Sequence, residues 1–153
     1  MRLAQGRATE AVVRIERQLE RTDTPRDYRW RSLLLHAIAL EQTGRHREAE
    51  LAYLAMVDDL PETEKTEALF RAGQLAYQDG RFAEAAQIFK MIWFNHAGSS
   101  RAAQAMFAEA DSSLMSGQHS ESAERFSQYL EQFPEGDLAE LARARLPFLY
   151  LTM

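Results

Sequence analysis

A glycine recurs along this chain at nearly constant spacing, and no other feature limits the available folds as strongly. The four glycines, separated by 38, 36 and 37 residues, are Gly6, Gly44, Gly80 and Gly117. A small residue stands five positions after each glycine and a bulky one nine positions after it. These residues are Ala11, Ala49, Ala85 and Ser122, then Ile15, Tyr53, Phe89 and Phe126. Small and bulky residues four positions apart share one face of a helix, so the pattern predicts repeated helix–turn–helix hairpins.

Each glycine is expected to end one helix, because glycine adopts the left-handed backbone conformation at little cost. The small residue then allows the second helix of the hairpin to approach the first closely. Pro61 and Pro134 each follow a turn glycine by seventeen residues and are suited to separating one hairpin from the next. Composition agrees, since Ala, Leu, Glu, Arg and Gln are abundant and only four prolines occur among 153 residues. We therefore predict an all-α fold.

In combination, these features resemble the tetratricopeptide repeat family over roughly residues 4–135. The resemblance implies a right-handed α-solenoid of antiparallel helix hairpins that binds other proteins and has no catalytic activity. The repeats here are longer than the usual 34 or so residues. Longer units, together with the run at 129–146, are similar to the tetratricopeptide proteins of the bacterial cell envelope, such as those of outer-membrane assembly and the Tol–Pal system.

The expected organisation is one solenoid domain of about three and a half repeats. Its parts are a half repeat (1–25), three repeats (26–61, 62–98 and 99–135), and a capping helix with an apolar tail (136–153). The expected helices are 7–21, 27–43, 45–59, 63–79, 81–95, 100–116, 118–132 and 137 to Pro147.

In such arrays the first helices of successive repeats line a concave groove, at positions ten and six before the turn glycine. The resemblance places six residues there: Leu34, Ile38, Phe70, Gln74, Phe107 and Asp111. Arg71 is expected at the margin. None of the six is Lys or Asn, so we exclude the carboxylate clamp that some family members use. We expect an apolar helix or extended peptide as ligand, with the two phenylalanines as anchors.

Two alternatives remain for this groove. Phe70 and Phe107 could be core residues, or the chain's own C-terminal helix could cover them. Asp111 either pairs with a cation of the ligand or is solvated.

The two ends of the chain are candidates for self-association. Ile15 and Leu19 would pack against a first helix that the half repeat lacks, which indicates either an excerpt of a longer solenoid or an edge that another segment covers. Phe148, Leu149 and Tyr150 either cap their own end or pack on a second molecule, which would give a homo-oligomer.

Several classes of function are excluded by what the sequence lacks. Cysteine is absent, no two histidines have a metal-ligand spacing, and no phosphate-binding loop is present. The net charge is −5, and residues 109–140 carry eight acids against one base, so a nucleic-acid surface is not expected. No stretch is apolar enough for membrane insertion. We predict no cofactor, no metal and no enzyme activity.

The leading hypothesis is a protein-interaction scaffold. One alternative is a cytosolic chaperone, like the tetratricopeptide chaperones of type III secretion, that shields apolar segments of secreted proteins. The other is a structural module that assembles head to tail. Location stays open: the periplasm or cell envelope if the chain is an excerpt of a longer secreted protein, and the cytoplasm otherwise.

Overall fold

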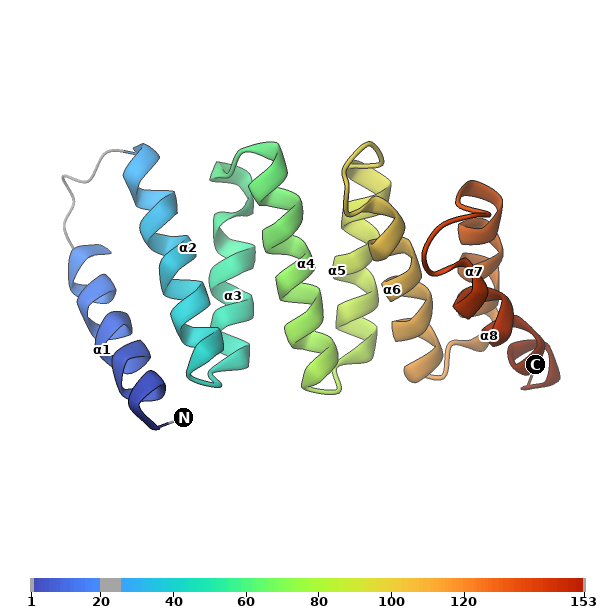
Figure 1. The fold of residues 1–153 in the computed structure, drawn as a ribbon, viewed down its shortest axis with the longest axis horizontal. Coiled ribbons are helices and arrows are strands. Elements are labelled where there is room, and N and C mark those ends of the chain that lie inside the picture. The colour runs from blue at the N-terminus through green and yellow to red at the C-terminus, as the bar shows by residue number, and fades with distance from the viewer. Residues whose placement is uncertain (1, 20–25, 153) are drawn as a thin grey trace. The chain divides into compact units, whose positions relative to one another are not determined.

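The fold consists of helices joined by short turns (Figure 1). This computed structural model describes residues 2–19 and 26–152. The helices are α1 (Arg2–Leu19), α2 (Arg26–Gln42), α3 (His46–Met56), a 3-10 turn (Val57–Asp59), α4 (Glu62–Gln78), α5 (Phe82–Asn95), α6 (Ala102–Met115), α7 (His119–Gln132) and α8 (Ala139–Thr152). Within these ranges no residue is in a β-strand, and the predicted all-α class is confirmed.

The chain forms two compact units, residues 1–75 and 76–153, and the boundary between them lies inside α4. In the first unit, α1 packs on α2 and α2 packs on α3. In the second unit, α5 packs on α6, α6 on α7 and α7 on α8 (Figure 1). In each of these five pairs, the two helices are consecutive in the sequence.

Three of the four repeated glycines end helices as predicted. Gly44, Gly80 and Gly117 have φ angles of 77°, 73° and 80°. In the first of these turns, the amide of Arg45 donates to the carbonyl of Leu40 at 3.0 Å, which closes the end of α2. The equivalent bonds after α4 and α6 are both 2.9 Å long. This geometry requires a left-handed residue just past the helix end, which explains the glycine.

The prediction of a fourth turn at Gly6 is wrong. Gly6 lies inside α1, which begins at Arg2, and its φ angle is not positive. The flanking residues are good helix formers, and one glycine costs a helix only about 1 kcal/mol relative to alanine. The helix therefore continues through Gly6 instead of starting after it.

The small and bulky residues after the turns form the contacts between paired helices. Ala49, Ala85 and Ser122 are fully buried, and so are the bulky residues four positions later. Ser122 shows how close the helices come, because its hydroxyl donates to the carbonyl of Ala110 on α6 at 2.8 Å. In α1 the equivalent Ala11 and Ile15 are only partly buried.

The predicted end of the last helix at Pro147 is wrong. α8 continues to Thr152 with the proline inside it. Proline removes one helical hydrogen bond and crowds the preceding turn. Burial offsets this loss, since Ala142 and Leu149 are fully buried and Leu146 packs against the same cluster. These residues recur at helical spacing, so one apolar face of α8 remains in the core on both sides of Pro147.

A charged cluster joins three helices of the second unit. Glu109 of α6 is buried; it accepts a hydrogen bond from the indole of Trp93 on α5 and lies 3.1 Å from Nε of Arg125 on α7. The Arg125 guanidinium also lies over the Trp93 ring, 4.4 Å from its centroid. Burial raises the pKa of Glu109, while Arg125 and the indole act in the opposite direction. In the first unit, Trp30 of α2 has Arg31 over its ring at 5.3 Å.

Candidate functional site

A hollow of about 320 Å³ lies on the first unit, between α2 and α4. Its lining residues are Leu34, Ile38, Glu41 and Gln42 of α2, Tyr53 of α3, and Glu67, Ala68 and Arg71 of α4. The lining combines an apolar part with charged side chains. Such a mixed surface suits a ligand that carries both kinds of group.

Helical spacing brings these residues together. Leu34, Ile38 and Glu41 stand on successive turns of one face of α2, four and three residues apart. On α4, Glu67 and Arg71 are four residues apart and face α2. Tyr53, the bulky residue of its repeat, reaches the hollow from α3. Each side chain is thus presented by a rigid helix.

The charged part of the hollow is a hydrogen-bonded network around Glu41. The Tyr53 hydroxyl donates to Oε2 of Glu41 at 3.1 Å, and Arg71 Nη1 lies 3.3 Å from Oε1 of the same carboxylate. Arg71 Nε also donates to Oε1 of Glu67 at 3.3 Å. Burial, followed by the negative charge of Glu41, raises the pKa of Tyr53. The tyrosine therefore keeps its proton at neutral pH and remains a donor to Glu41.

Three of the predicted groove residues line this hollow, and two others do not. Leu34, Ile38 and Arg71 are in its wall, whereas Phe70 and Gln74 are partly buried outside the lining. Sequence reasoning missed Glu41 and Tyr53 as site residues. Tyr53 was assigned only to packing, and nothing in its spacing shows that its hydroxyl reaches a carboxylate on another helix.

Phe107 is a core residue in the second unit and is not available as an exposed anchor. It is 9% exposed and makes edge-on contacts with Phe126 and Tyr129, at centroid distances of 5.2 and 5.9 Å. α8 contributes Leu149 to the same cluster. The role of anchor was wrong, because the helices of this unit enclose the ring.

Asp111 binds groups of its own chain. Its Oδ2 accepts a hydrogen bond from Tyr77 at 2.8 Å, and its Oδ1 lies 3.3 Å from Nη2 of Arg145 on α8. Burial, followed by the bond to Asp111, raises the pKa of Tyr77 to about 12. Its cationic partner is Arg145 of α8, so the contacts of Asp111 link α4, α6 and α8.

The candidate self-association residues fall into different environments. Leu149 is fully buried in the core of its own unit, in agreement with the first of its two alternatives, that it caps its own end. Phe148 and Tyr150 are each 60% exposed, and Ile15 is partly buried. The side chain of Leu19 lies outside the described residues.

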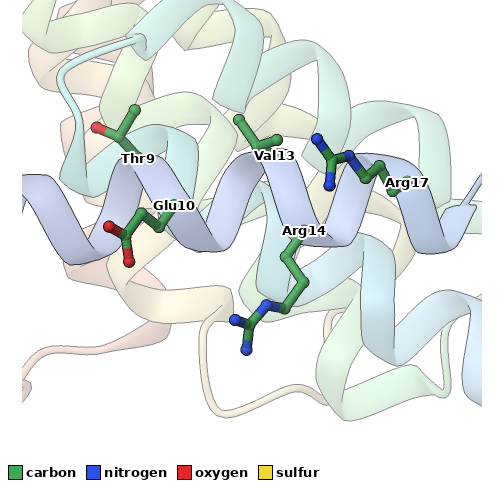
Figure 2. Close-up of a pocket in the computed structure, with 5 residues that line it drawn as sticks. All are labelled: Thr9, Glu10, Val13, Arg14 and Arg17. Atoms are coloured by element: carbon green, nitrogen blue, oxygen red, sulfur yellow. The ribbon is translucent and has the colours of Figure 1, made fainter.

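A second hollow, of about 340 Å³, lies along α1. Figure 2 shows that its lining residues, Thr9, Glu10, Val13, Arg14 and Arg17, all belong to this one helix. Glu10 and Arg14 project to one side and Thr9 and Val13 to the other (Figure 2). Among the described residues no facing element contributes to the lining, so side chains do not converge there as they do between α2 and α4.

Within residues 2–19 and 26–152, no group of three or more His, Cys, Asp or Glu side chains is placed to hold a metal ion. The same part of the chain contains no helix long and apolar enough to cross a membrane.

Comparison with known proteins identifies the repeat. The tetratricopeptide repeat family model matches residues 67–99, from α4 to the turn after α5. Two crystal structures share the fold: the nearly identical TPR-like repeats of a proposed kinesin light chain from Podosopora anserina, and a single-substitution variant of the same repeats. Both have a TM-score of 0.68 and 18% sequence identity.

These similarities extend over almost the whole chain. They cover 98% of it, and 81% of the variant or 82% of the other structure. The chain has the tetratricopeptide-like solenoid fold. The predicted resemblance to tetratricopeptide repeat proteins is therefore confirmed, and with it the fold class. The narrower likeness to cell-envelope proteins stays a prediction. No curated protein matches the sequence at a significant level.

Proposed function

We propose that this tetratricopeptide-like protein is a non-catalytic scaffold that holds an apolar segment of a partner protein in the hollow between α2 and α4. The observation that carries the proposal is the hollow itself, in which Leu34 and Ile38 form an apolar wall on a rigid helix. Repeat folds of this kind present extended surfaces to other proteins. Burial of an apolar side chain against this wall would supply the main binding energy.

The test is site-specific photo-crosslinking from the hollow. A photoreactive residue replaces Ile38 in one variant and Leu35 in a control, because Leu35 is the neighbour of Leu34 on α2 and is 57% exposed outside the lining. We expect a partner to crosslink from position 38 and much less from position 35.

Substitution then checks the same site. Leu34→Glu should abolish the crosslink, because it buries a charge against the apolar wall, while Leu35→Glu should leave it intact. Circular dichroism establishes that both variants keep their helicity. Equal crosslinking from the two positions, or a crosslink that survives Leu34→Glu, would show that the hollow is not the binding site.

Self-association through α8 is a second candidate, supported by a different surface. Leu141, Phe148 and Leu151 recur at helical spacing on the exposed side of α8, with Leu151 87% exposed. The measurement is sedimentation velocity over a hundredfold range of concentration. Self-association predicts a mass that rises with concentration and falls on Phe148→Ser substitution. A single monomer species over the whole range would refute it.

A further inference from the structure

We propose that α8 pairs with the α8 of a second copy of this chain, in antiparallel orientation and about a two-fold axis. This inference rests on the self-association proposed above and specifies its geometry. The observation that carries it is the spacing of four exposed residues along the helix. These residues, three, four and three positions apart, are Leu141, Ala144, Phe148 and Leu151.

This spacing gives α8 a second apolar face, here called the α8 seam. Alternating steps of three and four residues keep side chains on one side of a helix, in the narrow stripe along which two helices pack side by side. Ala139, Ala142 and Leu149 are buried in the second unit and lie on the other side of the helix. α8 can therefore keep its place in its own unit while the seam contacts another helix.

The order of residues along the seam makes it complementary to itself. A two-fold axis reverses the second helix, so the first seam residue of one copy faces the last of the other. Leu141 then lies opposite Leu151 of the second copy, and Ala144 lies opposite Phe148 of the second copy. Both pairs are centred on Leu146, so all the contacts form in one register. The large ring of Phe148 thus meets the smallest residue of the seam.

A parallel pair would pack less well. Each seam residue would face its own equivalent, so two phenylalanines would meet at one level and two alanines would leave a gap at the next. It would also bring like charges together. Glu135 and Asp137 precede α8, and neither forms an ion pair with another described residue. Antiparallel packing keeps these acids of the two copies roughly 20 Å or more apart, beyond the screening length of about 8 Å.

The charged residues beside the seam are already paired within the chain. Glu140 pairs with Arg143, and Arg145 pairs with Asp111 of α6. The seam itself contains no charged residue, so it neither repels a second copy nor attracts a protein of opposite charge. Large and small residues that match under a two-fold axis are required for self-pairing, whereas a surface for another protein does not need this symmetry. A second copy is therefore the occupant that the seam fits.

The size of the seam sets the strength expected of the pair. Leu141, Phe148 and Leu151 are 45%, 60% and 87% exposed, so all three would lose apolar surface to water on pairing. Three large side chains and one alanine cover less than the roughly 800 Å² per partner of a standard interface. We expect a weak dimer, with a dissociation constant on the order of tens of micromolar.

Disulfide crosslinking tests the orientation, because the chain has no cysteine of its own. Leu141→Cys and Leu151→Cys variants are mixed in a glutathione redox buffer. Antiparallel pairing predicts a disulfide between the two variants. In either variant alone the two cysteines of a dimer would be about 15 Å apart, too far for a disulfide. Tyr150→Cys is the control, since Tyr150 is as exposed as Phe148 but lies off the seam, and it should crosslink with neither variant.

Exchange of the large and small residues tests the packing, by sedimentation velocity. Phe148→Ala should weaken dimerisation about tenfold or more. Ala144→Phe should also weaken it, although it adds apolar surface, because two rings then compete for one space. The double variant restores a large residue opposite a small one and should recover the dimer. Tyr150→Ala should change the dissociation constant less than about twofold. Circular dichroism establishes that each variant keeps its helicity.

The outcomes separate this inference from the self-association on which it rests. A single monomer species over the whole concentration range would refute both. Crosslinking of Leu141→Cys with itself, or equal crosslinking of Tyr150→Cys, would overturn the antiparallel pairing and leave self-association standing. A double variant no better than Ala144→Phe would overturn the matched packing in the same way. The proposal for the hollow between α2 and α4 does not depend on these results.

Discussion

Glycine substitutions test which of the repeated glycines lie in turns and which lies inside a helix. Gly80 has a φ angle of 73°, and an added Cβ would meet nothing within 4 Å. Gly80→Ala therefore introduces no clash, and its whole cost is that of a left-handed backbone at a non-glycine residue. That cost is about 1–2 kcal/mol. Asparagine tolerates this conformation better, so Gly80→Asn should cost less.

Gly6 is the matched control, because a Cβ there also meets nothing within 4 Å, yet the residue lies inside α1. Alanine is preferred over glycine within a helix by up to about 1 kcal/mol. Gly6→Ala should therefore stabilise the protein slightly while Gly80→Ala destabilises it. The two variants should differ by roughly 1.5–3 kcal/mol in free energy of unfolding, as the sum of these two effects.

Urea unfolding followed by circular dichroism at 222 nm measures this difference. The expected order of midpoints is Gly6→Ala, wild type, Gly80→Asn, then Gly80→Ala. If Gly6→Ala lowered the midpoint as much as Gly80→Ala does, Gly6 would occupy a turn and α1 would begin after it. If Gly80→Ala had no effect, the left-handed turn after α4 would be refuted.

Two further predictions concern the second unit. Leu149→Ala should destabilise the protein by about 2–5 kcal/mol, because this fully buried side chain leaves a cavity, whereas Leu151→Ala, with the side chain 87% exposed, should change stability by less than about 0.5 kcal/mol in the same urea titration. Equal effects would show that α8 does not pack beyond Pro147. Burial raises the pKa of Glu109 above its unfolded value, so its contribution to stability is fully present below the unfolded pKa and is lost as pH rises through the folded one. The stability of the wild type minus that of Glu109→Gln should accordingly be larger near pH 4 than near pH 7, and the opposite trend would mean that the ion pair with Arg125 outweighs burial.

Much of the fold could be predicted because its determinants are local in sequence. The turn glycines and the small residues after them act within a single hairpin, so their spacing alone located the helices from α2 to α7 to within a few residues. Gly6 and Pro147 misled the prediction for one physical reason. A residue with poor helix propensity ends a helix only when its cost is not offset by helix-forming neighbours or by burial of the helix. The propensity of a single residue contains no information about these two contributions.

The candidate site could be predicted only in part, because contacts between helices decide it. Leu34 and Ile38 were found from their register in the repeat, and the structure places both in the hollow. Phe107 has the same register as Leu34, yet the helices of its own unit enclose it. The network around Glu41 joins three helices, and no spacing within one helix encodes such a contact.

Each of the two units contains one tryptophan, whose fluorescence can be used to follow unfolding of that unit. The chain has two tryptophans, Trp30 on α2 in the first unit and Trp93 on α5 in the second. Replacing either one by phenylalanine leaves a single emitter, so the fluorescence of each variant follows the loss of structure around one position. In repeat proteins whose neighbours stabilise each other pairwise, the ends can lose structure before the middle. A difference between the two fluorescence midpoints would reveal which half melts first.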